Sequence, residues 1–254
     1  MNWRAVKAFS YRILTHLLKQ KSLIIVEFLL WPFLLVVSFG LLVATMTNDI
    51  SALTYTLAAA ICWRVTSVLQ ENVSMSFVED FWHDTMKQTW TLPFHLSEFV
   101  LGNASFAVIS SFMTFLVTLV SSYFMFGTIY QPFSVFLICA FLLAIWGGII
   151  GIAVIAIILR FGEGAIRLGW ISTDMIILMS GVFYPLSILP LPLRFIAAFL
   201  PSTYLFEILK TRTLNSWYLE ASLLLMLAYF VVSWISAKEA LRHAKKVGRL
   251  VKFA

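Results

Sequence analysis

The amino-acid sequence predicts an all-α polytopic membrane protein with six transmembrane helices. Of its 254 residues, 61% are hydrophobic and only 12% are charged, whereas a soluble domain carries roughly 25% charged residues. Its apolar runs approach the roughly 20 residues with which a helix crosses the hydrocarbon core, and they lack the alternation of a membrane β-barrel. Because no internal repeat or low-complexity linker divides the chain, we expect residues 1–254 to form a single transmembrane domain.

The first predicted element is a helix over residues 1–21 that lies in the membrane interface. Apolar residues recur along it at helical spacing and basic residues line its other side, namely Val6, Phe9, Ile13 and Leu17 against Arg4, Arg12 and Lys19. This amphipathic pattern is typical of an interfacial helix. The alternative is a basic leader that merely precedes the first membrane anchor.

Six apolar segments long enough to cross the membrane follow. Spans one and two occupy 22–72, at about 23–46 and 52–72; spans three to five occupy 99–184, at about 99–126, 133–159 and 165–184; span six occupies 218–238. The first span exceeds the roughly 7–15 apolar residues of a signal peptide and has no clear cleavage site, so we expect it to be retained. Gly147 and Gly151 form a small-xxx-small pair in span four, which is a weak signal of close helix packing.

The basic residues predict the orientation of these spans. The short loops 47–51 and 127–132 contain no Lys or Arg, whereas the amino terminus, the turn at 160–167 and the tail at 239–254 hold most of them. By the positive-inside rule, we expect both termini to lie in the cytoplasm. The protein itself is expected in the cell (inner or plasma) membrane. The tail would face anionic lipids, and this position explains the net charge of +6 without any nucleic acid.

The longest cytoplasmic connection, residues 73–98, is predicted to contain a short amphipathic helix at about Phe77–Lys87. Its apolar half is formed by Phe77, Phe81 and Trp82. Its polar half is formed by Glu79, Asp80, His83, Asp84 and Lys87. Such a helix could simply lie on the membrane surface. Helices that bind anionic lipid are usually rich in Lys and Arg, however, and this one offers one lysine against three carboxylates. We therefore favour a helix that docks on a protein partner.

The sequence shows no motif for catalysis or for metal binding. It contains neither a GxSxG nucleophile motif nor a GxxxxGK[ST] phosphate loop. Its histidines all lie outside the spans and its two cysteines lie inside them without ligand spacing, the residues being His16, His83, His95, His243, Cys62 and Cys139. We expect a chain that is not an enzyme and binds no metal or cofactor itself.

A few ionisable residues lie within the predicted spans, where charge is costly and is often functional. They are Glu27, Arg64, Glu71 and Asp174. Arg64 and Asp174 could pair across two helices, or they could line a polar path that contacts a substrate. The sequence leaves both interpretations open.

Prolines interrupt the apolar segment before span six. Residues 181–210 hold four of the seven prolines, Pro185, Pro190, Pro192 and Pro201. Backbone groups that proline leaves unpaired survive in a membrane only where protein or water covers them. We therefore predict a re-entrant outer hairpin at 185–217, with one short helix around Leu193–Leu200 and another after Pro201. The alternative, a kinked seventh crossing, would place the basic tail outside the cell.

Two stretches carry a resemblance to a known family. Residues 160–210 contain "RFGEGAIRLGW" and a match to "SGVFYP…LP…LP.TY..E", formed by Ser180–Pro185, Leu189, Pro190, Leu200, Pro201, Thr203, Tyr204 and Glu207. Residues 76–102, "SFVEDFWHDTMKQTWTLPFHLSEFVLG", resemble the segment in which that family has its coupling helix and the start of its third span. Together with the order of elements, these motifs resemble the permease subunit of a type-2 (ABC-2) ATP-binding cassette exporter across nearly the whole chain.

The resemblance implies a mechanism. Two copies of the permease would each bind a separate ATPase subunit, which holds ATP and Mg, and Phe77–Lys87 would be the coupling helix that docks on it. The interfacial helix would brace that docking. The hairpin would act as an outer lid hinged at Tyr184, Pro185, Pro190 and Pro201, with Tyr204 beside them. The stretches "EDFWHDT" and "SILPLPLRF" depart from common family patterns, so individual docking contacts do not carry over.

The substrate stays open at this point. Hydrophobic drugs, lipids and lipid-linked polysaccharides all suit this architecture. A polysaccharide conduit would be lined by aromatic residues, for which Tyr55, Trp63, Phe106, Tyr123 and Trp146 are candidates, although such residues more often serve packing or interface anchoring. An ATP-independent membrane scaffold or an intramembrane enzyme is the competing class, and neither would need an ATPase partner.

Overall fold

The computed structural model describes residues 2–19, 25–82, 85, 88–89 and 94–247, and within them it contains helices and no strand. The elements are α1 (Trp3–Lys19), the π-helix η1 (Val26–Leu30), α3 (Trp31–Met46), α4 (Ile50–Trp82), α6 (Leu96–Phe126), α7 (Phe133–Phe161), the 3-10 helix η2 (Glu163–Ala165), α8 (Ile166–Met179), the 3-10 helix η3 (Leu186–Ile188), α9 (Leu191–Ala198), α10 (Pro201–Thr211) and α11 (Ser216–Val247). The predicted all-α polytopic fold is confirmed.

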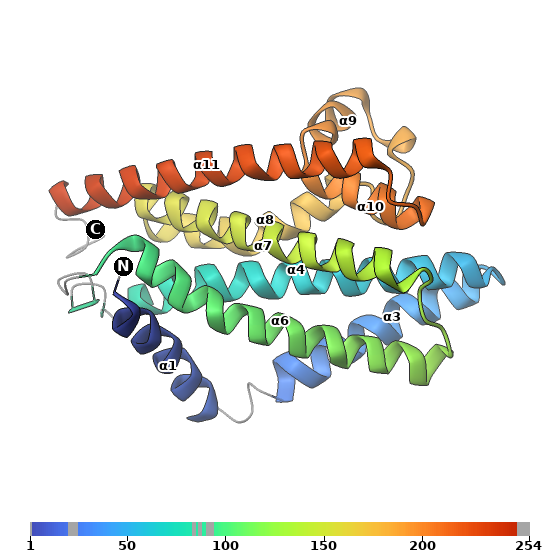
Figure 1. Ribbon diagram of the computed structural model, residues 1–254, viewed down its shortest axis with the longest axis horizontal. Coiled ribbons are helices and arrows are strands. Elements are labelled where there is room, and N and C mark those ends of the chain that lie inside the picture. The colour runs from blue at the N-terminus through green and yellow to red at the C-terminus, as the bar shows by residue number, and fades with distance from the viewer. Residues whose placement is uncertain (1, 20–24, 83–84, 86–87, 90–93, 248–254) are drawn as a thin grey trace.

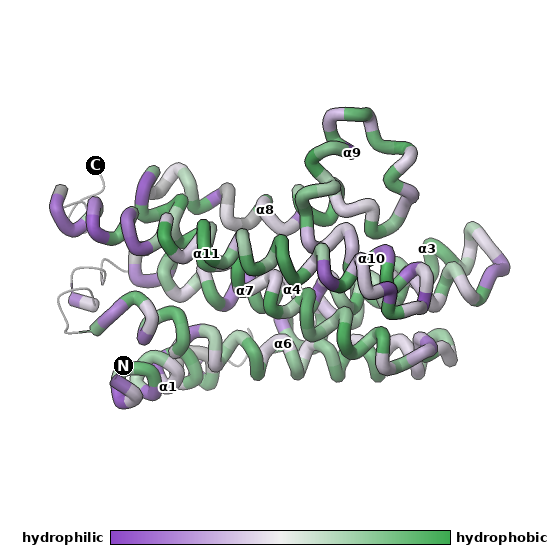
Figure 2. Tube along the Cα trace, turned by 45° about the horizontal axis from the view of Figure 1, so that its top comes forward, coloured by the Kyte–Doolittle hydropathy of each residue, from purple (hydrophilic) through white to green (hydrophobic). Residues whose placement is uncertain are grey.

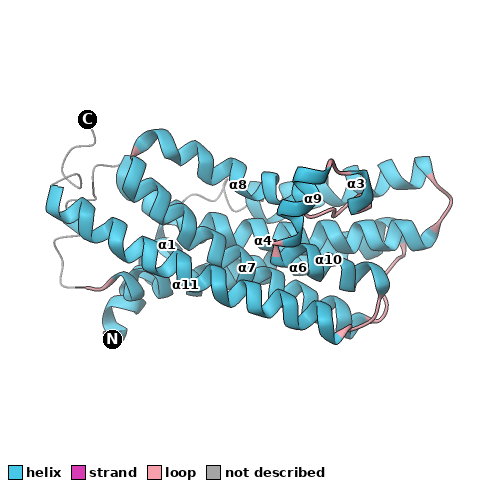
Figure 3. Ribbon diagram, turned by 90° about the horizontal axis from the view of Figure 1, so that it is seen from above, coloured by secondary structure: helices cyan, strands magenta, loops and turns pink. Residues whose placement is uncertain are grey.

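The long helices lie side by side as one elongated bundle (Figure 1). The connections 47–49, 127–132 and 212–215 meet at one end of the bundle, while α1, the end of α4 and the end of α11 meet at the other (Figures 1 and 3). Hydrophobic residues cover the middle of the bundle and hydrophilic ones gather toward its ends (Figure 2). The structure thus places α1 and the end of α11 at one end, as the sequence predicted. That this end faces the cytoplasm remains a prediction.

Five of the six predicted spans, all but the fifth, correspond to helices that are long and apolar enough to cross a membrane. In the described part of the chain, five helices are long and apolar enough to cross a membrane, or six if the bent pair α9 and α10 counts as one. The predicted fifth span, 165–184, corresponds to α8, which has 14 residues and ends at Met179. At 1.5 Å per residue it rises about 21 Å, less than the roughly 30 Å of a hydrocarbon core.

The centre of the bundle is a close contact between α4 and α7. A Cβ atom at Gly147 would lie 2.2 Å from the carbonyl oxygen of Thr66, and one at Gly151 would lie 2.8 Å from Cβ of Val73. Only glycine therefore lets the two backbones come this near. The weak packing signal of this glycine pair is confirmed as a real helix contact.

The segment predicted as a separate coupling helix is instead, as far as Trp82, the end of a long membrane helix. Helix α4 runs without a break from Ile50 to Trp82, over 33 residues. Phe77 and Val78 are buried in the core, because α6 packs against this end of α4. A short independent helix starting at Phe77 is therefore wrong, and the rest of that prediction, including His83, Asp84 and Lys87, lies outside the described residues.

The prolines of the outer segment begin helices rather than break them. Pro192 and Pro201 lie in the first turns of α9 and α10, and Pro190 and Pro185 precede α9 and η3. Proline is favoured there because its missing N–H would have no helical partner. Both short helices are present as predicted, with α9 beginning at Leu191 and bent by 89° from α10.

The chain returns after α9 to the point where it left the bundle. The hydroxyls of Ser180, at the end of α8, and Ser202, at the start of α10, lie 2.6 Å apart and are buried. Residues 181–200 thus leave the bundle and return to it, and α9 projects to one side of the bundle (Figure 1). This geometry favours the re-entrant hairpin over a kinked additional crossing.

We predict that Gly147→Ala lowers the thermal stability of the detergent-solubilised protein. The added methyl group meets a backbone oxygen that cannot move aside, and such overpacking costs about 1–3 kcal/mol. Gly164→Ala is the matched control, because no atom lies within 4 Å of its Cβ position. Equal melting temperatures for the two variants would contradict the α4–α7 contact.

Candidate coupling site

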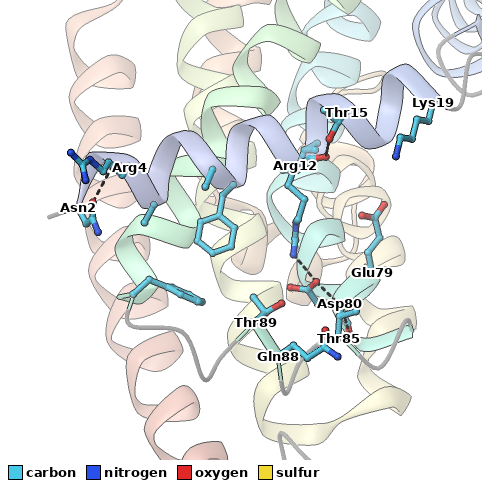
Figure 4. Close-up of a pocket in the computed structure, with 15 residues that line it drawn as sticks. Asn2, Arg4, Arg12, Thr15, Lys19, Glu79, Asp80, Thr85, Gln88 and Thr89 are labelled. Atoms are coloured by element: carbon cyan, nitrogen blue, oxygen red, sulfur yellow. Dashed lines mark hydrogen bonds and ion pairs between the residues drawn. The ribbon is translucent and has the colours of Figure 1, made fainter.

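A groove lies between α1 and the end of α4, at the end of the bundle where α1 lies (Figure 4). Its volume is about 970 Å³, and it is lined by residues of α1 and α4 together with Thr85, Gln88, Thr89 and Phe94. Basic side chains face it from α1 and acidic ones from α4, the labelled charged residues being Arg4, Arg12, Lys19, Glu79 and Asp80 (Figure 4). The groove joins the two elements that the sequence linked to docking.

Helix α1 is fixed to the start of α6 by an aromatic wedge. The ring of Phe9 packs edge-on against Phe94 and Phe99, at centroid distances of 4.9 and 5.2 Å. Gly102 makes room for it, since a Cβ there would lie 2.5 Å from Cβ of Phe9. The Ser10 hydroxyl donates to the Gly102 carbonyl at 2.9 Å. The predicted apolar face is thus buried against protein at Phe9, while the side chain of Leu17 is outside the described residues.

Glu98 joins the start of α1 to the start of α6. One of its carboxylate oxygens accepts from the backbone N–H of Asn2, and the other accepts from the N–H of His95 at 3.0 Å. With His95 as N-cap it forms a capping box on α6. Glu98 is not among the residues predicted from the sequence, although a glutamate three residues after the cap in "HLSE" is the pattern that identifies such a capping box.

Asp80 ties three segments together beneath α1. Its Oδ1 lies 2.8 Å from Nη1 of Arg12 and accepts a hydrogen bond from the Thr85 hydroxyl at 3.0 Å. The backbone N–H of Thr85 also donates to the Asp80 carbonyl. The Asp80 side chain is only 5% exposed, against 38% for Arg12. The sequence placed Asp80 on an open docking face; it is instead a buried brace, because α1 crosses over the end of α4.

The remaining predicted docking residues differ in their availability. Trp82, the last residue of α4, is half exposed, and Glu79 is partly exposed at the edge of the groove. Phe77 is fully buried and cannot contact a partner directly. The side chains of Phe81, His83, Asp84 and Lys87 lie outside the described residues. Of the predicted docking residues whose side chains the structure describes, Glu79 and Trp82 are thus more exposed than Phe77 and Asp80.

The charged residues within the spans are arranged differently from the predicted pair. Nη2 of Arg64 lies 3.2 Å from Oε2 of Glu27, on η1. Nη1 of Arg64 lies 3.5 Å from Oε1 of Glu71, seven residues further along α4. The ion pairs of Arg64 are thus with these two carboxylates and not with Asp174, although α8 contacts α4 nearby, where the Thr173 hydroxyl donates to the side-chain oxygen of Gln70. Asp174 is exposed on α8. Among the described residues, no group of three or more His, Cys, Asp or Glu side chains could hold a metal ion.

Comparison with known proteins now identifies the architecture. The family model described as ABC-2 type transporter matches residues 4–211, from the first turn of α1 to the end of α10. The chain belongs to the ABC-2 type transporter family. No curated protein matches the chain. As an ABC-2 permease it is a multi-pass membrane subunit for transport, of a family that generally works with an ABC ATPase.

The geometry shows what this ABC-2 permease can do at its α1 end. The Phe9 wedge, the Glu98 cap and the Arg12–Asp80 ion pair hold α1 across the end of α4. A force on the exposed end of α4 would therefore reach α1 and α6 as well. This arrangement suits mechanical coupling.

We predict that Arg12→Ala lowers the stability of the permease by about 1–3 kcal/mol. Loss of the guanidinium leaves a buried carboxylate without its ion pair, and the partial exposure of Arg12 keeps the cost below that of a fully buried pair. Thermal unfolding monitored by size-exclusion chromatography measures the effect.

Two further variants test whether the pair itself is responsible. Arg4→Ala removes an exposed arginine of the same helix and should change little. The exchanged pair, Arg12→Asp with Asp80→Arg, should recover part of the loss. If Arg12→Ala is no less stable than Arg4→Ala, Asp80 is not a brace.

Proposed function

We propose that this chain is the permease subunit of an ABC exporter, in which two copies of the chain each bind a separate ATPase that holds ATP and Mg. The substrate would be hydrophobic or amphipathic: a drug, a lipid or a lipid-linked polysaccharide. The observation that carries the proposal is the braced end of α4, where Asp80 is locked to α1 and Trp82 remains exposed.

Helix α4 supports coupling because it is long and uninterrupted. Its 33 residues rise about 50 Å, enough to cross the membrane and project beyond it. An ATPase that binds Glu79, Trp82 and the connection between α4 and α6 would thus contact the end of a membrane-crossing helix directly. Closure of two ATPases would move the two α4 helices together and alternate access to the pathway.

A second copy of the chain accounts for the exposed carboxylate of Asp174. An intramembrane charge faces protein or a water-filled cavity rather than lipid, yet Asp174 is exposed in the single chain, beside exposed Met175 and Leu178. In the exporter this face of α8 would line the path between two permeases, where Asp174 would contact substrate or water. The other apolar faces of the bundle would contact membrane lipids.

The orientation follows from the same proposal. The α1 end would lie in the cytoplasm, with both termini there, and the outer hairpin would lie on the far side of the cell membrane. The basic residues at the end of α11, including Lys245 and Lys246, suit an anionic inner leaflet. An ATP-independent scaffold or an intramembrane enzyme is the second class, but no observation of the described residues favours either.

Purification of the tagged chain from its native membrane tests the function. We expect an ABC ATPase to co-purify in a stoichiometric complex, and Glu79→Lys and Trp82→Ala to reduce its recovery while the permease stays folded. Both residues lie at the end of α4 where the ATPase would bind. A stable permease without any ATPase would favour the scaffold or enzyme class.

Asp174→Asn provides the matched control for that experiment. It lies on α8, outside the groove residues, so ATPase recovery should equal that of the unaltered chain. ATP-driven transport should fall about tenfold if the carboxylate contributes roughly 1.4 kcal/mol to substrate binding. A variant that loses the ATPase instead would place Asp174 in assembly rather than in the path.

A further inference from the structure

The first part of the outer hairpin, as far as α9, is mostly exposed, whereas α10, its second part, is buried against the bundle. Near its start Val182 is buried, and near its end Leu209 is buried. Between them, Leu191 is 77% and Phe195 is 68% exposed on α9. The exposed part of the hairpin thus lies between the buried Val182 at its start and the buried α10 at its end.

The first attachment is a hydrogen bond from α4. The hydroxyl of Tyr55 donates to the Val182 carbonyl at 2.7 Å. Gly181, just before it, has a φ of +64°, and a Cβ there would lie 2.7 Å from Leu186. Glycine is thus needed for the chain to turn out of α8, and Tyr55 fixes the residue that follows the turn.

The second attachment is made at the end of α10. Tyr130, in the loop between α6 and α7, donates its hydroxyl to the Leu209 carbonyl, which lies in the last turn of α10, where carbonyls lack helical partners. Burial raises the pKa of Tyr130 to about 12, so its phenol remains a donor at physiological pH. Arg212 then donates to the Ser51 hydroxyl at 2.9 Å and lies 5.6 Å over the Tyr130 ring.

Arg212 holds a backbone conformation that side chains seldom adopt. Its φ is +58°, in the left-handed region that favours glycine. The contacts with Ser51 and Tyr130 offset this cost and fix the position at which the chain leaves α10 for α11. The end of the hairpin is thus clamped to α4 and to the α6–α7 loop together.

We propose that Tyr55, Tyr130 and Arg212 are positioning residues that hold the hairpin against the outer end of the bundle, and that Tyr55 is the link through which α4 moves it. Tyr55 and Asp80 lie on the same unbroken helix, about 37 Å apart along its axis. A displacement of the coupling end therefore reaches the start of the hairpin, while Tyr130, on a separate loop, holds its end. The role of Tyr55 as the link through which α4 moves the hairpin rests on the proposed function, whereas the positioning role of the three residues does not.

Hydrogen exchange of the full chain in lipid nanodiscs tests the attachments without ATP or a partner. Tyr55→Phe and Tyr130→Phe each remove one hydroxyl, and loss of a hydrogen bond of about 1 kcal/mol raises the population of an opened segment about fivefold. We expect amides in 183–200 to exchange about fivefold faster in either variant. Tyr123→Phe is the control, because this tyrosine of α6 is half exposed and its ring lies beside that of the neighbouring Phe124.

Two results would overturn the attachments. Either exchange in 183–200 equals that of Tyr123→Phe, or exchange rises equally in α7 and α11, which would indicate general destabilisation. The link through α4 is tested with the ATPase complex: Tyr55→Phe should abolish the ATP-dependent change in exchange of 183–200, and Tyr130→Phe should preserve it. An unaltered change in Tyr55→Phe overturns the link, whereas absence of any ATPase complex refutes the proposed function and leaves the first comparison valid.

Discussion

The close backbone contact between α4 and α7 supports the rest of this structure. Membrane helices gain little from hydrophobic exclusion, so close packing between small residues has to hold them together. Gly147 and Gly151 allow that packing, and α4 is thereby fixed along the axis of the bundle. Each functional feature is then placed relative to α4, since α1 crosses one end of it and the hairpin is attached near the other.

Polar side-chain contacts along α4 join it to several neighbouring elements. Arg12 joins Asp80 at one end, Arg64 lies between Glu27 and Glu71, and Tyr55 holds Val182 near the other end. A further buried contact connects Gln70 with the Thr173 hydroxyl and the Gly169 carbonyl of α8. Such bonds are directional where apolar packing is not. They explain how one membrane helix can keep a fixed register with α1, α8 and the hairpin at once.

The sequence predicted the features that depend on local chemistry. Proline positions located α9 and α10, and hydropathy located the long helices, because both act within a few residues. It missed features that depend on distant partners. The burial of Asp80 requires α1 to cross α4, and the early end of α8 accompanies the contact between Ser180 and Ser202. The helical pattern at 77–82 was correct, but periodicity alone cannot distinguish a new helix from the end of the preceding one.

In the proposed exporter, the exposed end of α4 binds an ATPase and transmits its movement to the membrane helices. A photoreactive amino acid placed at Trp82 in the full chain, in intact cells, tests this most directly. We expect irradiation to join the permease to an ABC ATPase. The same probe at Trp217, in the first turn of α11, which begins at the opposite end of the bundle, should give no such product. Products at position 82 that contain lipid alone, or an ATPase captured equally at both positions, would contradict the account.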